Sequence, residues 1–150
     1  MDKKNRLFVD ADSCPVKKEI LAVAVRFGIC PIFVASYASF SSDREATWVF
    51  VDQEKEAADL YIANHVRQGD FVVTQDIGLA ALVLRRGVFV LSIRGKEISE
   101  NNISRLLDRR YLARQSLRSG KKLKGPKPFT DEDRKKFSDT LTKLLCRLDH

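Results

Sequence analysis

Short apolar runs alternate along the first 95 residues with segments whose apolar side chains recur at helical spacing. The runs are four to seven residues long and stop abruptly at Ser, Thr or Asp, as buried strands do. They predict strands at 6–10, 29–35, 48–51, 71–74 and 88–91. The periodic segments predict helices from about Asp12–Pro15 to Gly28, at 54–66 and at 77–86.

Strands that alternate with helices of ten or more residues indicate βαβ units. We therefore expect an α/β fold with three layers, in which a mostly parallel central sheet lies between helices. The length of 150 residues suits a single domain spanning 1–150, with its α/β core at 1–95.

The pattern changes after Arg94–Gly95, where residues 96–150 predict C-terminal helices. An Arg-rich helix is expected at 101–118, and a loop with Gly, Pro and Lys at 119–128. Thr130 is expected to cap the last helix. The apolar stripe of that helix consists of Phe137, Leu141, Leu144, Leu145 and Leu148.

Composition excludes several classes of protein. No run approaches the roughly 18 apolar residues of a membrane span, and the N-terminus lacks the apolar segment of a secretion signal. The three cysteines, Cys14, Cys30 and Cys146, form no C-x-x-C pair, which argues against a disulfide framework and a structural zinc site. The simplest expectation is a cytoplasmic protein that does not contact a membrane.

The net charge of +7 is concentrated in one segment. Residues 105–136 contain 12 Lys or Arg against four acids, a balance of +8, and the rest of the chain sums to −1. A basic cluster of this kind is typical of nucleic-acid binders. A solvated helix followed by a lysine-rich loop would explain the same charge equally well.

Acidic side chains follow two of the predicted strands. Asp10 and Asp12 come at the end of the first strand, and Asp76 follows the strand that ends at Thr74. Ligands of an open parallel sheet bind beyond the carboxyl ends of its strands. If the two strands are neighbours, three carboxylates converge at one edge, where a hard cation such as Mg²⁺ or Mn²⁺ would relieve their repulsion.

Asp59 is a fourth candidate because of its place on the predicted helix at 54–66. At about 100° per residue it projects between Ala63 and Val66, within the apolar face. A carboxylate there is costly unless it is paired or coordinated. Glu56 falls on the polar side with Arg67 and is expected at the surface.

Each acid also has a purely structural interpretation. Asp12 and Asp76 can be helix caps, Asp10 can satisfy loop amides, and Asp59 can pair with an arginine. The sequence pattern by itself leaves these alternatives open.

The run VDADSCPVKKEI resembles the signature of the YaiI/YqxD family of uncharacterised bacterial proteins, whose usual form is DADACPVK. The resemblance continues through EAADLYIANHV, GDFVVTQDIGLAALVL, Arg94–Gly95 and GPKPFTDEDRKKF, and so covers nearly the whole chain. Two differences are Ser13 in place of the usual Ala, and Ser92–Ile93 in place of Asn-Pro.

The family in turn resembles PIN-like domains, whose nuclease members bind one or two Mg²⁺ or Mn²⁺ ions through acids at strand ends. The resemblance implies that Asp10, Asp59 and Asp76 are metal ligands, and that Asp12 belongs to the family's own motif. Together, the four acids are the expected catalytic residues of a metal-dependent nuclease.

The resemblance also makes RNA, or another single-stranded nucleic acid, the expected substrate. Several polar and basic residues are candidates for holding it, while the sequence leaves the oligomeric state open and a homo-oligomer is compatible with it. The candidate substrate-binding residues are Thr74, Arg94, Arg109, Arg110, Arg114, Lys121, Lys122 and Lys124.

Three other functions compete with this one. A D-x-D at a first strand end also opens phosphatases of the haloacid dehalogenase type, but Cys14 stands where that site has Thr or Val, and Asp76 has no acidic neighbour. A thiolate phosphatase built on Cys14 would need an arginine where the chain has Ile20. The third alternative is a PIN-like module that binds nucleic acid or a protein without turnover.

Overall fold

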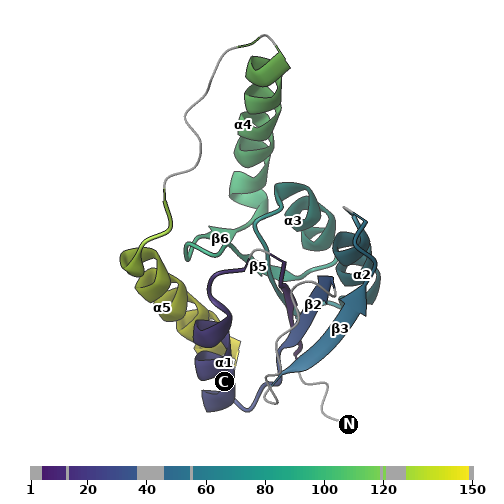
Figure 1. Cartoon of the computed structure of the whole chain (residues 1–150). Coiled ribbons are helices and arrows are strands. Elements are labelled where there is room, and N and C mark those ends of the chain that lie inside the picture. The colour runs from purple at the N-terminus through teal and green to yellow at the C-terminus, as the bar shows by residue number, and fades with distance from the viewer. Residues whose placement is uncertain are drawn as a thin grey trace.

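The computed structural model describes residues 5–12, 14–36, 46–54, 56–118, 120 and 128–148. Within these ranges, six strands form one sheet in the order β3-β2-β1-β4-β5-β6, with helices on both faces (Figure 1). The strands are β1 (Leu7–Asp10), β2 (Ile32–Ser36), β3 (Thr47–Val51), β4 (Phe71–Val73), β5 (Phe89–Leu91) and β6 (Glu97–Ile98). All neighbours are parallel except β5 and β6. The predicted α/β class and mostly parallel sheet are confirmed.

The helices are α1 (Lys17–Arg26), α2 (Ala57–His65), α3 (Ile77–Leu84), α4 (Glu100–Arg118) and α5 (Asp131–Leu148). Helix α1 begins later than the sequence predicted, at Lys17, and no side chain caps it. Asp12 is therefore not its N-cap, and Ser13 lies outside the described residues. The predicted loop at 119–128 is described only at residues 120 and 128. None of the described helices is long and apolar enough to span a membrane.

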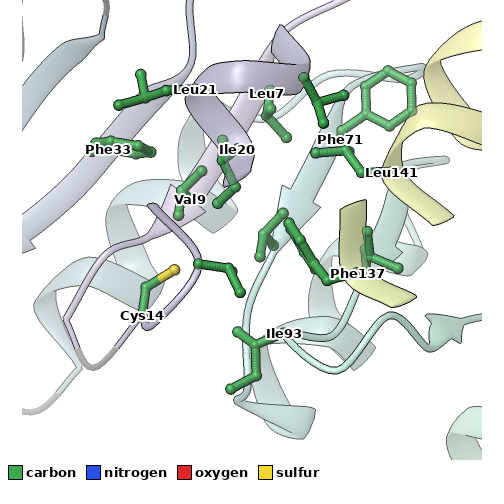
Figure 2. Packing of buried hydrophobic residues seen from close by; sticks show 14 of the residues in the cluster. Leu7, Val9, Cys14, Ile20, Leu21, Phe33, Phe71, Ile93, Phe137 and Leu141 are labelled. Carbon is green, nitrogen blue, oxygen red and sulfur yellow. The ribbon is translucent and has the colours of Figure 1, made fainter. Parts of the chain in front are cut away.

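Alternation along the strands divides the core into two layers. On one face, Leu7 and Val9 of β1 pack with Ile20 of α1 and with Phe137 and Leu141 of α5 (Figure 2). On the other face, Phe8 belongs to a cluster formed with α2 and α3, which includes Ile62, Leu79 and Val83. Since successive residues of a strand point to opposite faces, Asp10 is directed to the same side as Phe8.

Helix α5 docks on the sheet through the Arg94–Gly95 turn. Gly95 has a φ of +81°, and a Cβ there would lie 2.7 Å from the carbonyl carbon of Lys136. The Arg94 guanidinium donates to Asp133 Oδ2 at 2.8 Å, and Thr140 Oγ1 donates to the Gly95 carbonyl at 3.0 Å. Only glycine combines this backbone conformation with this close approach, which gives the turn a structural explanation.

The N-terminus of α5 confirms the predicted cap. Thr130 Oγ1 accepts from the Asp133 amide at 3.2 Å, and Asp133 Oδ2 accepts from the Thr130 amide at 3.0 Å. This reciprocal pair satisfies two amides that a helix start leaves without intrahelical partners.

The order of the strands creates a switch point between β1 and β4. The chain passes from β1 to β2 through α1 on one face of the sheet, and from β3 back to β4 through α2 on the other (Figure 1). Crossovers that leave in opposite directions open a crevice at the carboxyl ends of the two central strands. The predicted neighbours β1 and β4 are indeed paired, and the acids that follow them meet in this crevice.

Candidate functional site

The last residue of β1, Asp10, is held by the residue that follows β4. Thr74 Oγ1 donates to Asp10 Oδ2 at 3.2 Å and accepts from the Asp76 amide at 3.0 Å. Thr74 is only 1% exposed. Its predicted contact with a substrate is therefore not available, because the hydroxyl is buried and already bonded. Thr74 instead orients Asp10 and Asp76 relative to each other.

Asp76 combines the two roles that the sequence left as alternatives. Its Oδ1 accepts from the amides of Gly78 at 2.8 Å and Leu79 at 3.3 Å, and so caps α3. Burial opposes ionisation of this carboxyl. The hydrogen bond from Asp59, the two amides and the positive charge of Arg110 outweigh it and lower the pKa of Asp76.

Asp59 projects from α2 toward the same place, as its helical phase predicted. Its side chain is half-buried and shares a hydrogen bond with the carboxyl of Asp76. Burial raises the pKa of Asp59 to about 7, helped by this hydrogen bond and by the charges of Asp76, Asp10 and Glu56. Below about pH 7 Asp59 therefore carries a proton beside the ionised Asp76.

The pKa of Asp10 is also raised, to about 6. Burial is the main cause, and repulsion from Asp12 and Asp76 adds to it, while the hydrogen bond from Thr74 works in the opposite direction. Carboxyls that resist ionisation in this way are stabilised when they bind a cation or a proton.

Asp12 reaches the site from the loop after β1. Its Oδ1 accepts from the Ser36 amide at 3.2 Å and from Ser36 Oγ at 3.3 Å. The side chain thereby ties the end of β2 to the loop after β1, which explains its place in the D-x-D motif better than a helix cap does.

Two hollows meet at Asp76. A cleft of about 460 Å³ is lined by Asp10, Asp12, Gln75, Asp76, Ile77 and Arg110. A second pocket of about 330 Å³ is lined by Glu56, Asp59, Leu60, Asp76, Gly78, Leu79, Leu82, Arg110 and Arg114. Asp76 and Arg110 belong to both linings, so the two hollows adjoin.

Arg110 of α4 stands at the junction of the two hollows. Its Nη1 lies 3.8 Å from Asp76 Oδ1. A Cβ at Gly78 would lie 2.7 Å from the same nitrogen. The absence of a side chain at Gly78 therefore provides the space that the guanidinium occupies.

The other predicted basic residues differ in their places. Arg114 lines the second pocket, and Arg109 is exposed on α4 but lines neither hollow. Arg94 lines neither hollow, and its guanidinium is bonded to Asp133 and lies over the ring of Phe129. Lys121, Lys122 and Lys124 lie outside the described residues.

Several residues that line the hollows were not predicted from the sequence, among them Ile77, Leu60 and Leu79, and Glu56 was expected only at the surface. Gln75 lies between Thr74 and Asp76, Gly78 follows the capping aspartate by two positions, and Leu82 projects from α3. The D-x-G spacing directly after a strand end is the signal that could have pointed to Gly78, since a residue without a side chain permits a close approach there.

The chemistry of the acids suits Mg²⁺ or Mn²⁺, although their geometry is only partly that of a metal site. Among the residues that the structure describes, no three His, Cys, Asp or Glu side chains form a cluster arranged to hold a metal ion. Asp59 with Asp76, and Asp10 with Asp12 and Asp76, do interact electrostatically. Mg²⁺ commonly takes one or two carboxylates and completes its shell with waters and substrate phosphates, so these oxygen donors fit it.

Comparison with known sequences shows which family the chain belongs to. Residues 8–147 match the family described as "Uncharacterized BCR, YaiI/YqxD family". A UPF0178 protein of Bacillus velezensis is 50% identical over 146 residues, which cover 96% of this chain and 87% of the relative. A UPF0178 protein of Listeria monocytogenes serotype 4b is 46% identical over 141 residues, covering 93% of this chain and 97% of the relative. No solved structure gives a significant match.

Proposed function

The chain belongs to the YaiI/YqxD family. We propose that it is a metal-dependent nuclease that cleaves single-stranded RNA, with Asp10, Asp12, Asp59 and Asp76 as its catalytic residues. The observation that carries the proposal is the meeting of these acids at the switch point between β1 and β4. Asp10, Asp12 and Asp76 line the cleft there, and Asp59 lines the adjoining pocket.

The proposed metal ligands are Asp10, Asp59 and Asp76. Carboxylate oxygens are the donors that hard divalent cations prefer. When bound, Mg²⁺ or Mn²⁺ would polarise a phosphate and lower the pKa of a water molecule. The raised pKa values of Asp10 and Asp59 support this role, because a cation would compensate both the burial that mainly raises them and the repulsion between the acids that adds to it.

The residues around the acids have supporting tasks. Thr74 fixes the orientation of the Asp10 carboxyl by donating to Oδ2. Asp12 lines the cleft beside Asp10 and can orient a water through its carboxylate. Asp59 is partly protonated at neutral pH, and it would release this proton when a metal ion binds beside Asp76.

Positive charge for the substrate backbone is supplied by α4. Arg110 lines the cleft together with the acids, Arg114 lines the adjoining pocket, and Arg109 is exposed on the same helix. A guanidinium holds a phosphate through two parallel hydrogen bonds. Because Arg110 is near Asp76, a phosphate bound to it would lie beside the acids.

A second function is favoured by one specific observation. The hydrogen bond between Asp59 and Asp76 and the charge of Arg110 already relieve part of the repulsion within the acid group. A protein that needs no metal to balance these charges could bind nucleic acid without cleaving it. This alternative predicts RNA binding that survives replacement of Asp10.

Cleavage of a pooled library of single-stranded RNA and DNA separates the two functions. The wild type with Mn²⁺ should cleave the library, and the Asp76→Asn variant should lose at least about 100-fold of that rate, the range found when groups that stabilise charge in a transition state are removed. Asp108→Asn is a matched control, since Asp108 is an exposed acid on α4 outside both hollows. Binding without cleavage in any divalent ion would support the module instead.

A further inference from the structure

The pocket on the α2 side of Asp76 has a composition that differs from that of the acid cleft. We call it the leucine pocket, after Leu60 of α2 and Leu82 of α3 in its lining. Its volume of about 330 Å³ lies at the small end of the range for ligand sites, and suits one nucleotide unit rather than a length of polymer.

Two leucines give the leucine pocket an apolar surface in contact with water. Leu60 is 57% exposed and Leu82 is 53% exposed, although both lie next to polar active-site candidates. Large apolar side chains that share a concave surface are typical of a binding site, because their contact with water is unfavourable until a ligand covers them. A flat aromatic ring is a ligand that can cover both.

Charged groups of both signs surround the leucines. Arg110 and Arg114 reach the pocket from α4, and Glu56 and Asp59 reach it from α2. No ion pair engages Arg114 in the part of the chain that the structure describes. A ligand that combines an apolar ring, hydrogen-bond donors and an anionic group would match all three kinds of lining, and a nucleotide has this combination.

We propose that the leucine pocket binds the nucleobase of the nucleotide next to the phosphate that is held at Arg110. The inference deepens the proposed function and rests on it. The base lies against Leu60 and Leu82, while the phosphate lies between Arg110 and Arg114. Because Asp76 and Arg110 line both hollows, a base in the pocket fixes which phosphate enters the acid cleft.

The carboxylate of Glu56 makes the pocket selective for bases with donor groups. An ionised carboxylate only accepts hydrogen bonds. Guanine offers two adjacent donors, N1–H and N2–H, which match the two oxygens of one carboxylate. Uracil offers a single N–H between two carbonyl oxygens, which the carboxylate repels. The leucine pocket therefore prefers guanine to uracil.

The test is a titration of the full chain with 5′-GMP and with 5′-UMP, without metal, followed by amide NMR shifts. GMP should shift the amides of α2 and α3 around Leu60 and Leu82 and bind at least about 5-fold more tightly than UMP. The Leu60→Ala/Leu82→Ala double variant should weaken GMP binding about 10-fold, within the range for losing one base contact. Glu56→Gln should bring the GMP and UMP affinities together.

Leu112→Ala serves as the matched control, since Leu112 is 59% exposed on α4 and lines neither hollow. All these leucines are exposed, so their replacement should not disturb folding. The inference is overturned by the absence of GMP binding at 10 mM (on the order of the weakest useful affinities), by shifts confined to other surfaces, or by equal losses in the double variant and the control.

The titration needs neither metal nor turnover, which keeps it separate from the proposed function. If GMP binds in the pocket but the library is not cleaved, the proposed nuclease activity is contradicted and the nucleobase site is supported. If the double variant cleaves the library with the same rate and base preference as the wild type, the nucleobase site is contradicted and the nuclease activity is supported.

Discussion

The carboxyl groups of Asp59 and Asp76 share a hydrogen bond, although one projects from the first turn of α2 and the other caps α3. Because the pKa of Asp59 is raised to about 7 and that of Asp76 is lowered, the shared proton lies on Asp59. The pair thus takes up a proton as the pH falls below about 7, next to the cleft where Asp10 lies.

Replacing Asp59 should change how stability depends on pH. The pKa of Asp59 is about 7 in the folded chain against 3.8 as its ordinary value. Between pH 7 and pH 4 the folded state therefore binds a proton that the unfolded state does not, and stability rises as pH falls through this window. The contribution is absent above pH 7, where the folded carboxyl is charged as well.

The variant to compare is Asp59→Asn, which cannot ionise. After allowance for solvent screening of this half-exposed group, we expect it to gain about 1 kcal/mol at pH 8, or about 2–4 °C in Tm. The gain should vanish near pH 4. Thermal unfolding at the two pH values measures it, with Asp108→Asn as the control, since Asp108 is an exposed acid on α4 that lines neither hollow. Equal Tm values for Asp59→Asn and wild type at pH 8 would contradict the prediction.

Divalent cations should stabilise the wild type and not the variant without Asp10. An ion at 100 times its Kd stabilises the folded state by about 2.7 kcal/mol, which for a chain of this size is about 5–10 °C in Tm. The effect should decline below pH 7 and then below pH 6, as first Asp59 and then Asp10 become protonated. Thermal shift with Mn²⁺ at pH 8 and pH 5 tests it, and a shift of equal size in Asp10→Asn would place the ion elsewhere.

Gly78→Ala should separate substrate binding from stability. The added methyl group would lie 2.7 Å from Arg110 Nη1, so the guanidinium must leave its place beside Asp76. The helical position itself tolerates alanine, and we expect Tm to stay within about 2 °C of the wild type. RNA affinity should fall about 10-fold, the loss typical of one arginine–phosphate contact of about 1.4 kcal/mol.

Fluorescence anisotropy with a labelled RNA measures this loss, and Arg105→Gln provides a control, since Arg105 is exposed on the same helix and lines neither hollow. Unchanged RNA affinity in the Gly78→Ala variant would show that Arg110 does not bind the substrate.

Asp70 is an acid whose role is structural, and its replacement should affect stability alone. It is 3% exposed and accepts from the amides of Arg6 at 2.9 Å and Arg67 at 2.8 Å, and from the Arg6 guanidinium at 3.1 Å. Asp70→Ala removes the acceptor of both amides, while the Arg6 guanidinium keeps its bond to the His65 carbonyl, and should cost about 2–4 kcal/mol. Chemical denaturation measures the loss. Unchanged stability would show that water replaces the carboxylate at no cost.

The parts of the fold that depend on local patterns could be predicted from the sequence. Apolar runs located β1 to β5, and helical phase directed Asp59 inward, because burial imposes a period of 2 on strands and 3.6 on helices. Strand β6, at Glu97–Ile98, was missed because two residues are too few to establish a period.

The parts that depend on distant contacts could not be predicted. Arg94 was expected at the substrate, but it bonds to Asp133, 39 positions further along the chain. Thr74 was expected to be open to a ligand, but the packing of neighbouring strands buries it. Asp12 was considered as a helix cap, but its partner is Ser36, 24 positions away. No local pattern indicates which of these tertiary partners a polar side chain will find.

The most direct test of the metal site is a crystal of the protein soaked in millimolar Mn²⁺, measured by anomalous diffraction. We expect an anomalous peak between Asp10 and Asp76, about 2–2.6 Å from their carboxylate oxygens, with the Arg110 guanidinium displaced or bonded to an anion. A map without a peak at these residues at millimolar Mn²⁺, or with a peak only elsewhere on the surface, would contradict it.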